Sequence, residues 1–414
     1  MGGDVVRESA LAGRVVLWEE SARDGAQAKT LMAPGFRVRL AREQGRVFGV
    51  DGPRHVVFAA GFPAVCAEEF EAVRRVAVEA EGAVSVAAVC RGRAADVRQA
   101  VASVRGTAHA RVMVIVPASE AMARVMTHRT AREALELGVA LVEEARGLTG
   151  GVAVDVCLAD ATRADHGLLA ESAVALTAAG AGVVVLADTV GDQLPSDVAR
   201  LFTRVRAAAD DEVVLASHLH NDLGLGLANT LQALEAGVRV VSSSWLGIAE
   251  RSGLVATEQL LFLLAHRAQY TARLLGEGAD PWWTAPDLTR LPGIARMVSE
   301  ETGVPLSVTT PIVGTGVGTI STGTPFVHPR LFQPFDPEEL MGITPRVVLT
   351  QLASARVVRT VAARLGRELD DAQAHAAMAW VKQHAYRTGL AVVDDDAFGC
   401  YLEGLHTDVT EDER

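Results

Sequence analysis

The chain has 414 residues, of which 49 % are hydrophobic and 22 % are charged, and its formal net charge is −12. This composition is typical of a globular protein with a large core and excludes an intrinsically disordered chain. The negative charge argues against nucleic acid or an anionic membrane surface as a partner, because both attract basic proteins.

Neither a membrane span nor an export signal is expected. No run reaches the roughly 18 consecutive apolar residues of a membrane helix, and Met1–Arg14 lacks the apolar core of a signal peptide. The expected location is therefore the cytoplasm. The four cysteines form no CxxC pair, and Cys90 and Cys157 lie in apolar runs, where core thiols are expected.

Short valine-rich runs alternate with helical patterns through the first two thirds of the chain. Such near-continuous β-branched runs are typical of parallel strands that are buried on both faces. The eight runs are 15–18, 55–60, 84–89, 112–116, 152–157, 182–187, 212–216 and 238–242. Segments long enough for helices follow them, such as 66–79, 130–146, 165–178 and 223–235.

Eight such units predict an α/β fold with a (β/α)8 TIM barrel. An open doubly wound sheet is the alternative, but it usually has fewer strands and a glycine-rich first turn, whereas the turn after Trp18 is polar and charged. We expect the barrel to span 14–275 and to end with a helix over 257–275. A linker subdomain over 276–344 and a helical subdomain over 345–414 are predicted to follow.

Polar side chains follow the first and seventh runs, at the barrel end where such enzymes place their sites. His218 and His220 are two positions apart, so in extended chain they point the same way. Together with Asp24 after the first run, they offer two imidazoles and a carboxylate, a common set of ligands for a divalent metal. A chance pair of histidines in a polar loop is the alternative.

Several motifs together resemble the DRE-TIM metallolyases, which include the isopropylmalate, citramalate and homocitrate synthases and the 3-hydroxy-3-methylglutaryl-CoA lyases. The resemblance covers about residues 15 to 395. The motifs that carry it are Arg23-Asp24-Gly25-Ala26-Gln27, His218-Leu219-His220-Asn221-Asp222, Ala187-Asp188-Thr189-Val190-Gly191, Gly247-Ile248-Ala249-Glu250-Arg251-Ser252-Gly253, Gly61-Phe62-Pro63 and Phe335-Asp336-Pro337-Glu338.

The resemblance implies a metal-dependent enzyme that condenses an acyl-CoA, such as acetyl-CoA, with a small 2-oxo acid. It gives Asp24, His218 and His220 the role of ligands to Zn, Mn, Fe or Mg, and it implies a homodimer. Arg23 would neutralise the developing alkoxide and, with Gln27, would contact the substrate.

Two more substrate contacts and a second catalytic candidate follow from the same resemblance. Arg163 and Thr189 would bind the substrate carboxylate, since arginine offers a planar fork to it. Glu250 is the second catalytic candidate, although an ion pair with Arg251 that only braces the metal loop remains open.

The chain departs from the family pattern where the synthases generate the acetyl-CoA enolate. Ala159 stands at the position of a glutamate, and Pro325 stands at the position of a linker histidine. The nearby His328 is a candidate substitute for that histidine. Glu20 and Ser21 replace a pair of threonines. Glu20 is open to two interpretations, as a new ligand or base and as a solvated loop carboxylate.

Three hypotheses follow from these matches and departures. The first is a homocitrate or isopropylmalate synthase-like acyltransferase that forms a 2-hydroxy acid. The second is a divergent lyase or aldolase that cleaves a hydroxy acid on the same metal site. The third is a non-catalytic family member.

Overall fold

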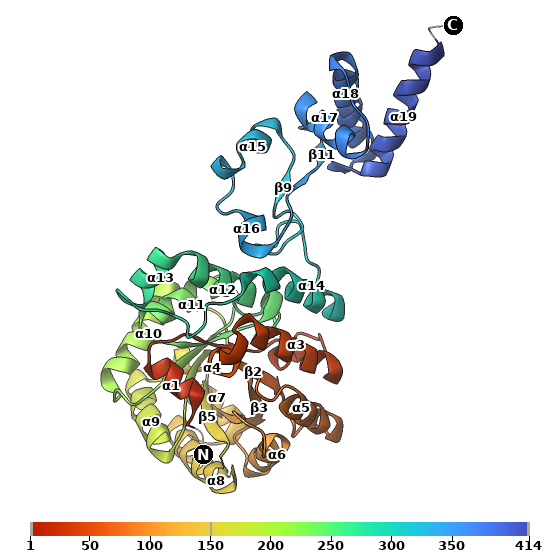
Figure 1. Ribbon diagram of the computed structural model, residues 1–414. Coiled ribbons are helices and arrows are strands. Elements are labelled where there is room, and N and C mark those ends of the chain that lie inside the picture. Colours follow the sequence, from red (N-terminus) through yellow and green to blue (C-terminus); the bar gives the residue numbers. More distant parts are fainter. Residues whose placement is uncertain (1–2, 150, 412–414) are drawn as a thin grey trace. The chain divides into compact units, whose positions relative to one another are not determined.

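The computed structural model describes residues 3–149 and 151–411 and divides the chain into two compact units, Met1–Leu306 and Ser307–Arg414. In the first unit, eight parallel strands close into a barrel in sequence order (Figure 1). They are β1 (Val16–Glu19), β2 (Val56–Gly61), β3 (Ser85–Arg91), β4 (Arg111–Pro117), β5 (Ala153–Ala159), β6 (Val184–Asp188), β7 (Leu215–Leu219) and β8 (Val240–Ser243). The predicted TIM barrel is confirmed.

Helices surround the eight strands and lie at the ends of the barrel (Figure 1). They are α1 (Val5–Leu11), α2 (Asp24–Gln27), α3 (Pro34–Val47), α4 (Gly52–His55), α5 (Ala67–Glu79), α6 (Ala94–Val104), α7 (Glu120–Thr127), α8 (Ala131–Thr149), α9 (His166–Ala179), α10 (Pro195–Ala208), α11 (Gly226–Glu235), α12 (Thr257–His266), α13 (Ala268–Leu275) and α14 (Leu291–Thr302). Inward side chains from successive strands, including Trp18, Met113 and Cys157, form one buried cluster. The strands are thus buried on both faces, which explains their continuous apolar sequence.

The seventh strand begins later than its predicted run. We expected residues 212–216, but β7 is Leu215–Leu219, because a turn closed by a hydrogen bond from the amide of Val213 to the carbonyl of Asp210 precedes it. His218 therefore lies inside the strand, and its position is fixed by the pairing of β7 with β6.

A short helix that the sequence pattern did not predict, α1, packs against the barrel. Val6 and Ala10 of α1 join the buried cluster inside the barrel. Asp4 caps the helix through the amides of Val6 and Arg7. The same carboxylate pairs with the buried Arg111 at the start of β4, which also binds Asp155 of β5 with two hydrogen bonds. Charged groups at the N-terminal ends of the strands of a barrel usually serve stability.

The first unit extends beyond the boundary that we expected at residue 275. Residues 276–306, which we assigned to a linker, belong to this unit. Trp282 packs against Phe48 with ring centroids 5.2 Å apart, and α14 buries Leu291, Ile294, Ala295 and Val298. These apolar contacts hold the segment on the barrel. The helix predicted over 257–275 is also divided, at Arg267, into α12 and α13.

The second unit combines short strands with helices around its own core. Its elements are β9 (Thr319–Ile320), α15 (Gly323–Val327), α16 (Pro337–Met341), β10 (Arg346–Val347), β11 (Leu349–Thr350), α17 (Ala355–Arg364), α18 (Asp371–Thr388), β12 (Val392–Val393) and α19 (Asp395–Glu411). Val357, Val361, Val381 and Phe398 lie in its buried cluster. Residues 346–350 form strands rather than the helix that we expected from 345 onward.

Among the residues that the structure describes, no helix is long and apolar enough to cross a membrane.

Candidate metal centre

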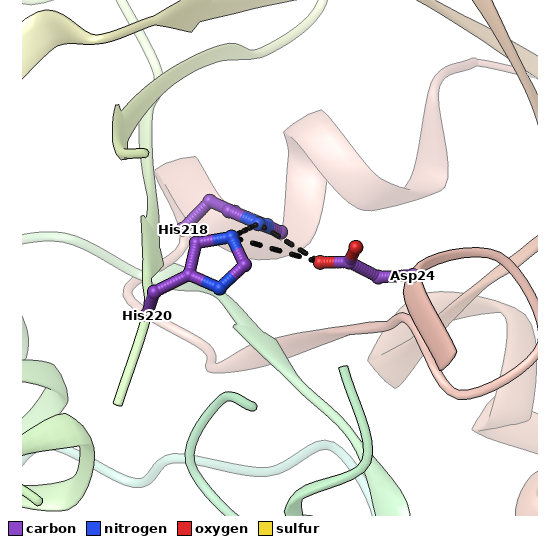
Figure 2. A group of neighbouring side chains, drawn as sticks. All are labelled: Asp24, His218 and His220. Atoms are coloured by element: carbon purple, nitrogen blue, oxygen red, sulfur yellow. Dashed lines mark hydrogen bonds and ion pairs between the residues drawn. The ribbon is translucent and has the colours of Figure 1, made fainter. Parts of the chain in front are cut away.

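Asp24, His218 and His220 meet at the C-terminal end of the barrel (Figure 2). The Nε2 atoms of the two histidines are 3.2 Å apart, and Asp24 Oδ2 lies 3.4 Å from His218 Nε2 and 3.8 Å from His220 Nε2. All three side chains are buried. The three residues that the sequence predicted as metal ligands are therefore brought together.

This arrangement fits a divalent cation. Ligand atoms that bind one cation at about 2.1 Å lie roughly 3.0–3.4 Å from their neighbours, close to the separations found here. Asp24 Oδ2 is buried and has no hydrogen-bond partner among the described residues, an unfavourable state that a bound cation would relieve. Two imidazoles and a carboxylate suit Zn, Mn or Fe, and Mg less well.

Neighbouring groups set the orientation and charge of the ligands. His218 Nδ1 lies 3.0 Å from the hydroxyl of Ser242 on β8, which fixes the ring and leaves Nε2 to face the site. Burial and the neighbouring His218 lower the pKa of His220 to about 4, so this imidazole keeps a free lone pair at neutral pH. Burial alone would raise the pKa of Asp24, but the charge of Arg23 together with the neighbouring His218 and His220 holds the pKa of this carboxyl well below its usual range.

Glu20 lies inside the site. The interpretation of this residue as a solvated loop carboxylate is wrong. Its side chain is fully buried and accepts two hydrogen bonds of 2.7 Å from Nε and Nη2 of Arg23. Glu20 Oε1 also lies 3.6 Å from His218 Nδ1. Burial alone would raise the pKa of Glu20, but Arg23 and His218 together outweigh that effect and lower the pKa, so Glu20 and Arg23 form an ionised pair.

Arg23 consequently keeps only one nitrogen for other partners. Nη1 donates to Gln27 Oε1 at 3.3 Å and lies 3.7 Å from Asp24 Oδ1. The guanidinium carbon is 5.8 Å from the centre of the Phe62 ring. Arg23 is thus held between Glu20 and Phe62, with one edge directed toward the metal ligands.

Thr189 and Arg163, two predicted substrate contacts, are joined through Asp160 rather than to the metal ligands. The Thr189 hydroxyl accepts a hydrogen bond from the amide of Asp160 at 2.8 Å, and Arg163 Nε donates to Asp160 Oδ1 at 2.7 Å. Asp160 is fully buried, whereas the Arg163 side chain is 51 % exposed. Arg163 therefore needs to change partner or share Asp160 in order to bind a substrate carboxylate.

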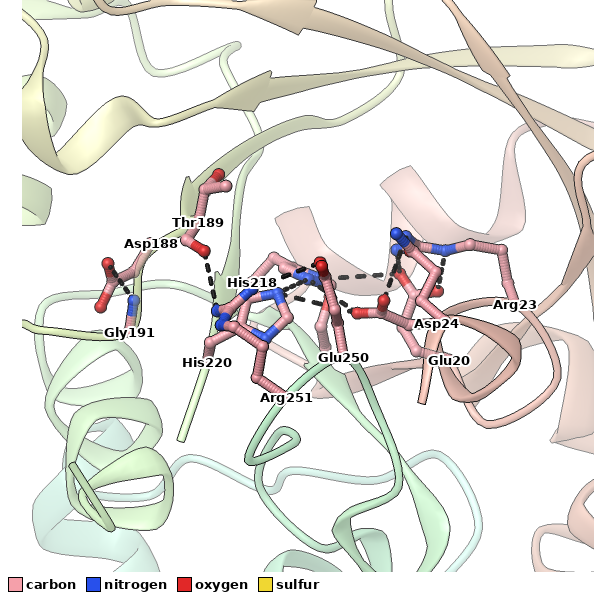
Figure 3. Close-up of polar contacts among 12 residues, drawn as sticks. Glu20, Arg23, Asp24, Asp188, Thr189, Gly191, His218, His220, Glu250 and Arg251 are labelled. Carbon is pink, nitrogen blue, oxygen red and sulfur yellow. Dashed lines mark hydrogen bonds and ion pairs between the residues drawn. The ribbon is translucent and has the colours of Figure 1, made fainter. Parts of the chain in front are cut away.

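The loop after β8 is braced by Arg251 (Figure 3). Arg251 donates two hydrogen bonds of 2.9 Å to Asp222 and one to the carbonyl oxygen of Thr189. Glu250, the predicted catalytic partner, is 41 % exposed and lies 3.3 Å from Arg251 Nη1. The arrangement matches the bracing ion pair that we left open.

Glycine is required in this loop for a steric reason. Gly253 has φ +86°, and a Cβ there would lie 1.8 Å from the carbonyl oxygen of Gly247. The Gly253 carbonyl in turn accepts from the amide of Asn221, directly after His220. The tight turn thus connects the loop after β8 to the histidine segment.

The two positions that depart from the family pattern carry no carboxylate or imidazole. Ala159 is the last residue of β5 and is buried. Pro325 lies in α15 of the second unit, and His328, exposed, follows that helix. Among the described residues of the first unit, the acidic side chains beside the metal ligands are Asp24 itself and Glu20.

The sequence did not predict the partners of three residues of the site. Ser242 contacts His218, and Phe62 contacts Arg23, from strands that are distant in sequence, whereas Asp160 contacts Arg163 within one loop. A general signal did exist, since each of the three lies close to the C-terminal end of a barrel strand. That signal predicts the end of the barrel at which each side chain lies, but it does not predict which residue the side chain contacts.

Comparison with known proteins identifies a family and relatives for this chain. The HMGL-like family model matches residues 14–298. The 2-isopropylmalate synthase of Syntrophus aciditrophicus is 31 % identical over 304 residues, 73 % of this chain and 55 % of that protein. The 2-isopropylmalate synthase of Solidesulfovibrio magneticus is 30 % identical over 402 residues, 94 % of this chain and 74 % of that protein. The chain spans about half the length of the Syntrophus protein.

Solved structures share the fold. The HMG-CoA lyase of Brucella melitensis superposes with a TM-score of 0.55 at 22 % identity, over 70 % of this chain and 99 % of the lyase. The hydroxymethylglutaryl-CoA lyase of Pseudomonas aeruginosa gives a TM-score of 0.55 at 23 % identity, over 72 % of this chain and 95 % of the lyase. At these identities the likeness concerns the barrel.

Proposed function

The chain belongs to the HMGL-like family of DRE-TIM metallolyases, and from that premise we propose that it is an acyltransferase. The proposed reaction condenses an acyl-CoA, such as acetyl-CoA, with a 2-oxo acid, and water then hydrolyses the thioester to give a 2-hydroxy acid and free coenzyme A. The observation that carries the proposal is the buried cluster of Asp24, His218 and His220 at the C-terminal end of a closed barrel. Relatives named 2-isopropylmalate synthase support the direction of synthesis.

Each residue of the cluster has a distinct task in this proposal. A divalent cation held by Asp24, His218 and His220 would act as a Lewis acid on the carbonyl of the 2-oxo acid. Ser242 keeps His218 in the tautomer that presents Nε2. Arg23, through Nη1, stabilises negative charge that develops on the carbonyl oxygen, because a fixed donor in a water-poor site needs no reorganisation.

Substrate contacts are proposed for Gln27, Arg163 and Thr189. Gln27 is placed by Arg23, with 3.3 Å between the two polar atoms. Arg163 is half exposed, and its planar guanidinium group offers two parallel donors to a carboxylate. Glu250 we propose as a brace for the loop through Arg251 rather than as a group that touches the substrate.

A hydroxy-acid lyase or aldolase is a second candidate, and one observation favours it. Abstraction of a proton from the acyl methyl needs a base within about 3 Å, and Ala159 places a methyl group where the synthases carry a glutamate. A retro-aldol reaction needs a base for a hydroxyl proton instead. A non-catalytic role is the third candidate, but a scaffold has no need for a buried carboxylate with an unpaired oxygen beside two imidazoles.

Free thiol release tests the proposal. Purified protein with Mn²⁺ or Zn²⁺, acetyl-CoA and a panel of 2-oxo acids should release thiol with at least one acid. His218→Ala should abolish release and lower metal content. His375→Ala, an exposed histidine of α18, is the matched control and should change neither. Thiol release absent from a metal-loaded protein, with cleavage of 2-hydroxy acids instead, would favour the lyase.

The homodimer, the cytoplasmic location and the separate linker and helical subdomains stay predictions. Size-exclusion chromatography with light scattering tests the first of these directly.

A further inference from the structure

Glu20 and Arg23 form a buried ion pair directly beside the metal ligands (Figure 3). The side chain of Glu20 is fully buried, and that of Arg23 is 7 % exposed. Desolvation of both charges offsets much of their attraction, so a buried pair adds little net stability compared with apolar side chains. Stability alone therefore does not account for a charged pair at this place, and its contacts need a separate explanation.

The backbone of Glu20 anchors the turn that carries Arg23 and Asp24. Its carbonyl oxygen accepts hydrogen bonds from the amides of Arg23 at 3.1 Å, Asp24 at 2.8 Å and Gly25 at 3.2 Å. Its own amide donates to the carbonyl oxygen of Ser243, at the end of β8, at 2.9 Å. The backbone that bears the Arg23 side chain is thus fixed to the barrel, and the remaining freedom of Arg23 lies in its side chain.

The carboxylate of Glu20 removes that freedom. Its two oxygens accept hydrogen bonds of 2.7 Å from Nε and Nη2 of Arg23. A guanidinium group is planar and rigid, so two bonds along one edge fix the direction of its third nitrogen. The guanidinium carbon also lies over the Phe62 ring, 5.8 Å from the centre of the ring. Nη1 is consequently held at one place, 3.7 Å from Asp24 Oδ1.

The same pair keeps the charge of Arg23 from competing with a cation. Among the described residues, Glu20 and Asp24 are the acidic groups that form ion pairs with Arg23. A carboxylate that pairs fully with a guanidinium offers fewer lone pairs to a metal. Because Glu20 takes two of the donors, Asp24 stays available as a metal ligand.

We propose that Glu20 is a positioning residue for the condensation. It holds Arg23 by one edge, so that Nη1 is presented to the carbonyl oxygen of the 2-oxo acid, and it keeps Asp24 free for the metal. The inference rests on the proposed function, because it takes Arg23 as the group that stabilises charge on that oxygen. The family pattern has a threonine at this position, so the role is absent from that pattern.

Steady-state thiol release at saturating Mn²⁺ tests the positioning role. Glu20→Gln keeps the size of the side chain but replaces one acceptor with a donor, so Arg23 is no longer held along its edge. We expect kcat to fall roughly 10- to 100-fold, the loss that a small misplacement of a catalytic group causes. The KM for the 2-oxo acid should stay nearly the same, because the lost interaction is made in the transition state. An unchanged or higher kcat would overturn the proposal.

A second background separates positioning from general support of the fold. In Arg23→Ala, the further change Glu20→Gln should not lower kcat again, because its effect passes through Arg23. An equal loss in both backgrounds would refute the positioning role. Asp155→Asn is the matched control, because Asp155 accepts from Nε and Nη2 of Arg111 in the same manner at the N-terminal ends of the strands. This variant should leave kcat as it is.

Binding of guanidinium tests the same contact without turnover, and it applies even where Glu20→Gln alone fails to fold. Arg23→Ala removes the guanidinium group and leaves the Glu20 carboxylate to bind one from solution. Guanidinium chloride, titrated calorimetrically at concentrations that do not denature the Mn²⁺-loaded protein, should bind Arg23→Ala roughly tenfold more tightly than Arg23→Ala/Glu20→Gln, because the hydrogen bonds to a carboxylate are charge-assisted. Equal binding to both variants would overturn the proposal.

The outcomes keep this inference apart from the proposed function. Guanidinium binding that depends on Glu20, in a protein that releases no thiol with any 2-oxo acid, would support the contact and contradict the acyltransferase. Thiol release that survives Glu20→Gln at the rate of the wild type would support the acyltransferase and contradict the positioning role.

Discussion

The first prediction concerns Glu258→Gln. This variant should keep the folding stability that the wild type loses as the pH rises to neutral. Glu258 lies on α12 and is fully buried. Glu258 Oε2 accepts from the amide of Leu246 at 3.1 Å, and Oε1 has no hydrogen-bond partner among the described residues. Burial, with a smaller effect of the Glu19 charge, raises the pKa of Glu258 from 4.5 to about 7.

The sign follows from proton uptake. A carboxyl with a raised pKa stays protonated in the folded chain while it is ionised in the unfolded chain, so the folded chain loses stability as the pH rises. The contribution of Glu258 to the free energy of unfolding is fully present below pH 4.5, falls between pH 4.5 and pH 7, and is lost above pH 7. A shift of this size corresponds to about 3 kcal/mol, at 1.36 kcal/mol per pH unit. Burial also raises the pKa of Glu19 to about 7, so the wild-type slope includes both residues.

Urea unfolding at pH 5 and pH 8.5 measures the effect. Tryptophan emission reports mainly on the first unit, because Trp18, Trp245, Trp282 and Trp283 lie in it. Glu258→Gln keeps an oxygen for the Leu246 amide and should gain up to about 3 kcal/mol over the wild type at pH 8.5.

Near pH 5 the same variant should gain little. Glu136→Gln, an exposed residue of α8, is the control for net charge and should show no such pH dependence. A Glu258→Gln effect that is equal at both pH values would refute the reasoning.

Three further predictions concern single side chains. Ser242→Ala should lower metal affinity roughly 10- to 100-fold, because it removes the partner that orients His218. Chelator competition measures this affinity, and an unchanged value argues against an orienting role of Ser242. Arg111→Ala should cost about 3–5 kcal/mol in urea unfolding, because it leaves buried Asp155 without its cation; a loss below 1 kcal/mol contradicts the buried pair. Phe398→Ala should destabilise the second unit by about 3–5 kcal/mol. This loss should appear as faster hydrogen exchange of the backbone amides in α17 and α18. Unchanged exchange in these helices would count against a core around Phe398.

The barrel and its metal ligands were predictable from the sequence because their signals are local. Parallel strands buried on both faces produce continuous apolar runs, and alternation along a strand places His218 and His220 on one side. The first of these signals located all eight strands within a few residues.

The environment of Glu20 was not predictable in the same way. A carboxylate three positions before an arginine is common on protein surfaces, and nothing in the local sequence marks this one as buried. Its burial results from barrel closure, which brings Nδ1 of His218 on β7 within 3.6 Å of Glu20 Oε1. Ser242 and Phe62 raise the same difficulty, because their partners come from other strands.

The hydrogen bond that joins the ends of β1 and β8 has a consequence for the nascent chain. Ser21 and the amide of Trp245, which this bond connects, are 224 positions apart. At a translation rate of about 5–20 residues per second, the first strand waits roughly 10 to 45 s for its second neighbour. During that interval one edge of β1 is open to pairing with other chains. Slower synthesis should therefore increase aggregation of this protein in cells, and chaperones that bind early in translation should reduce it.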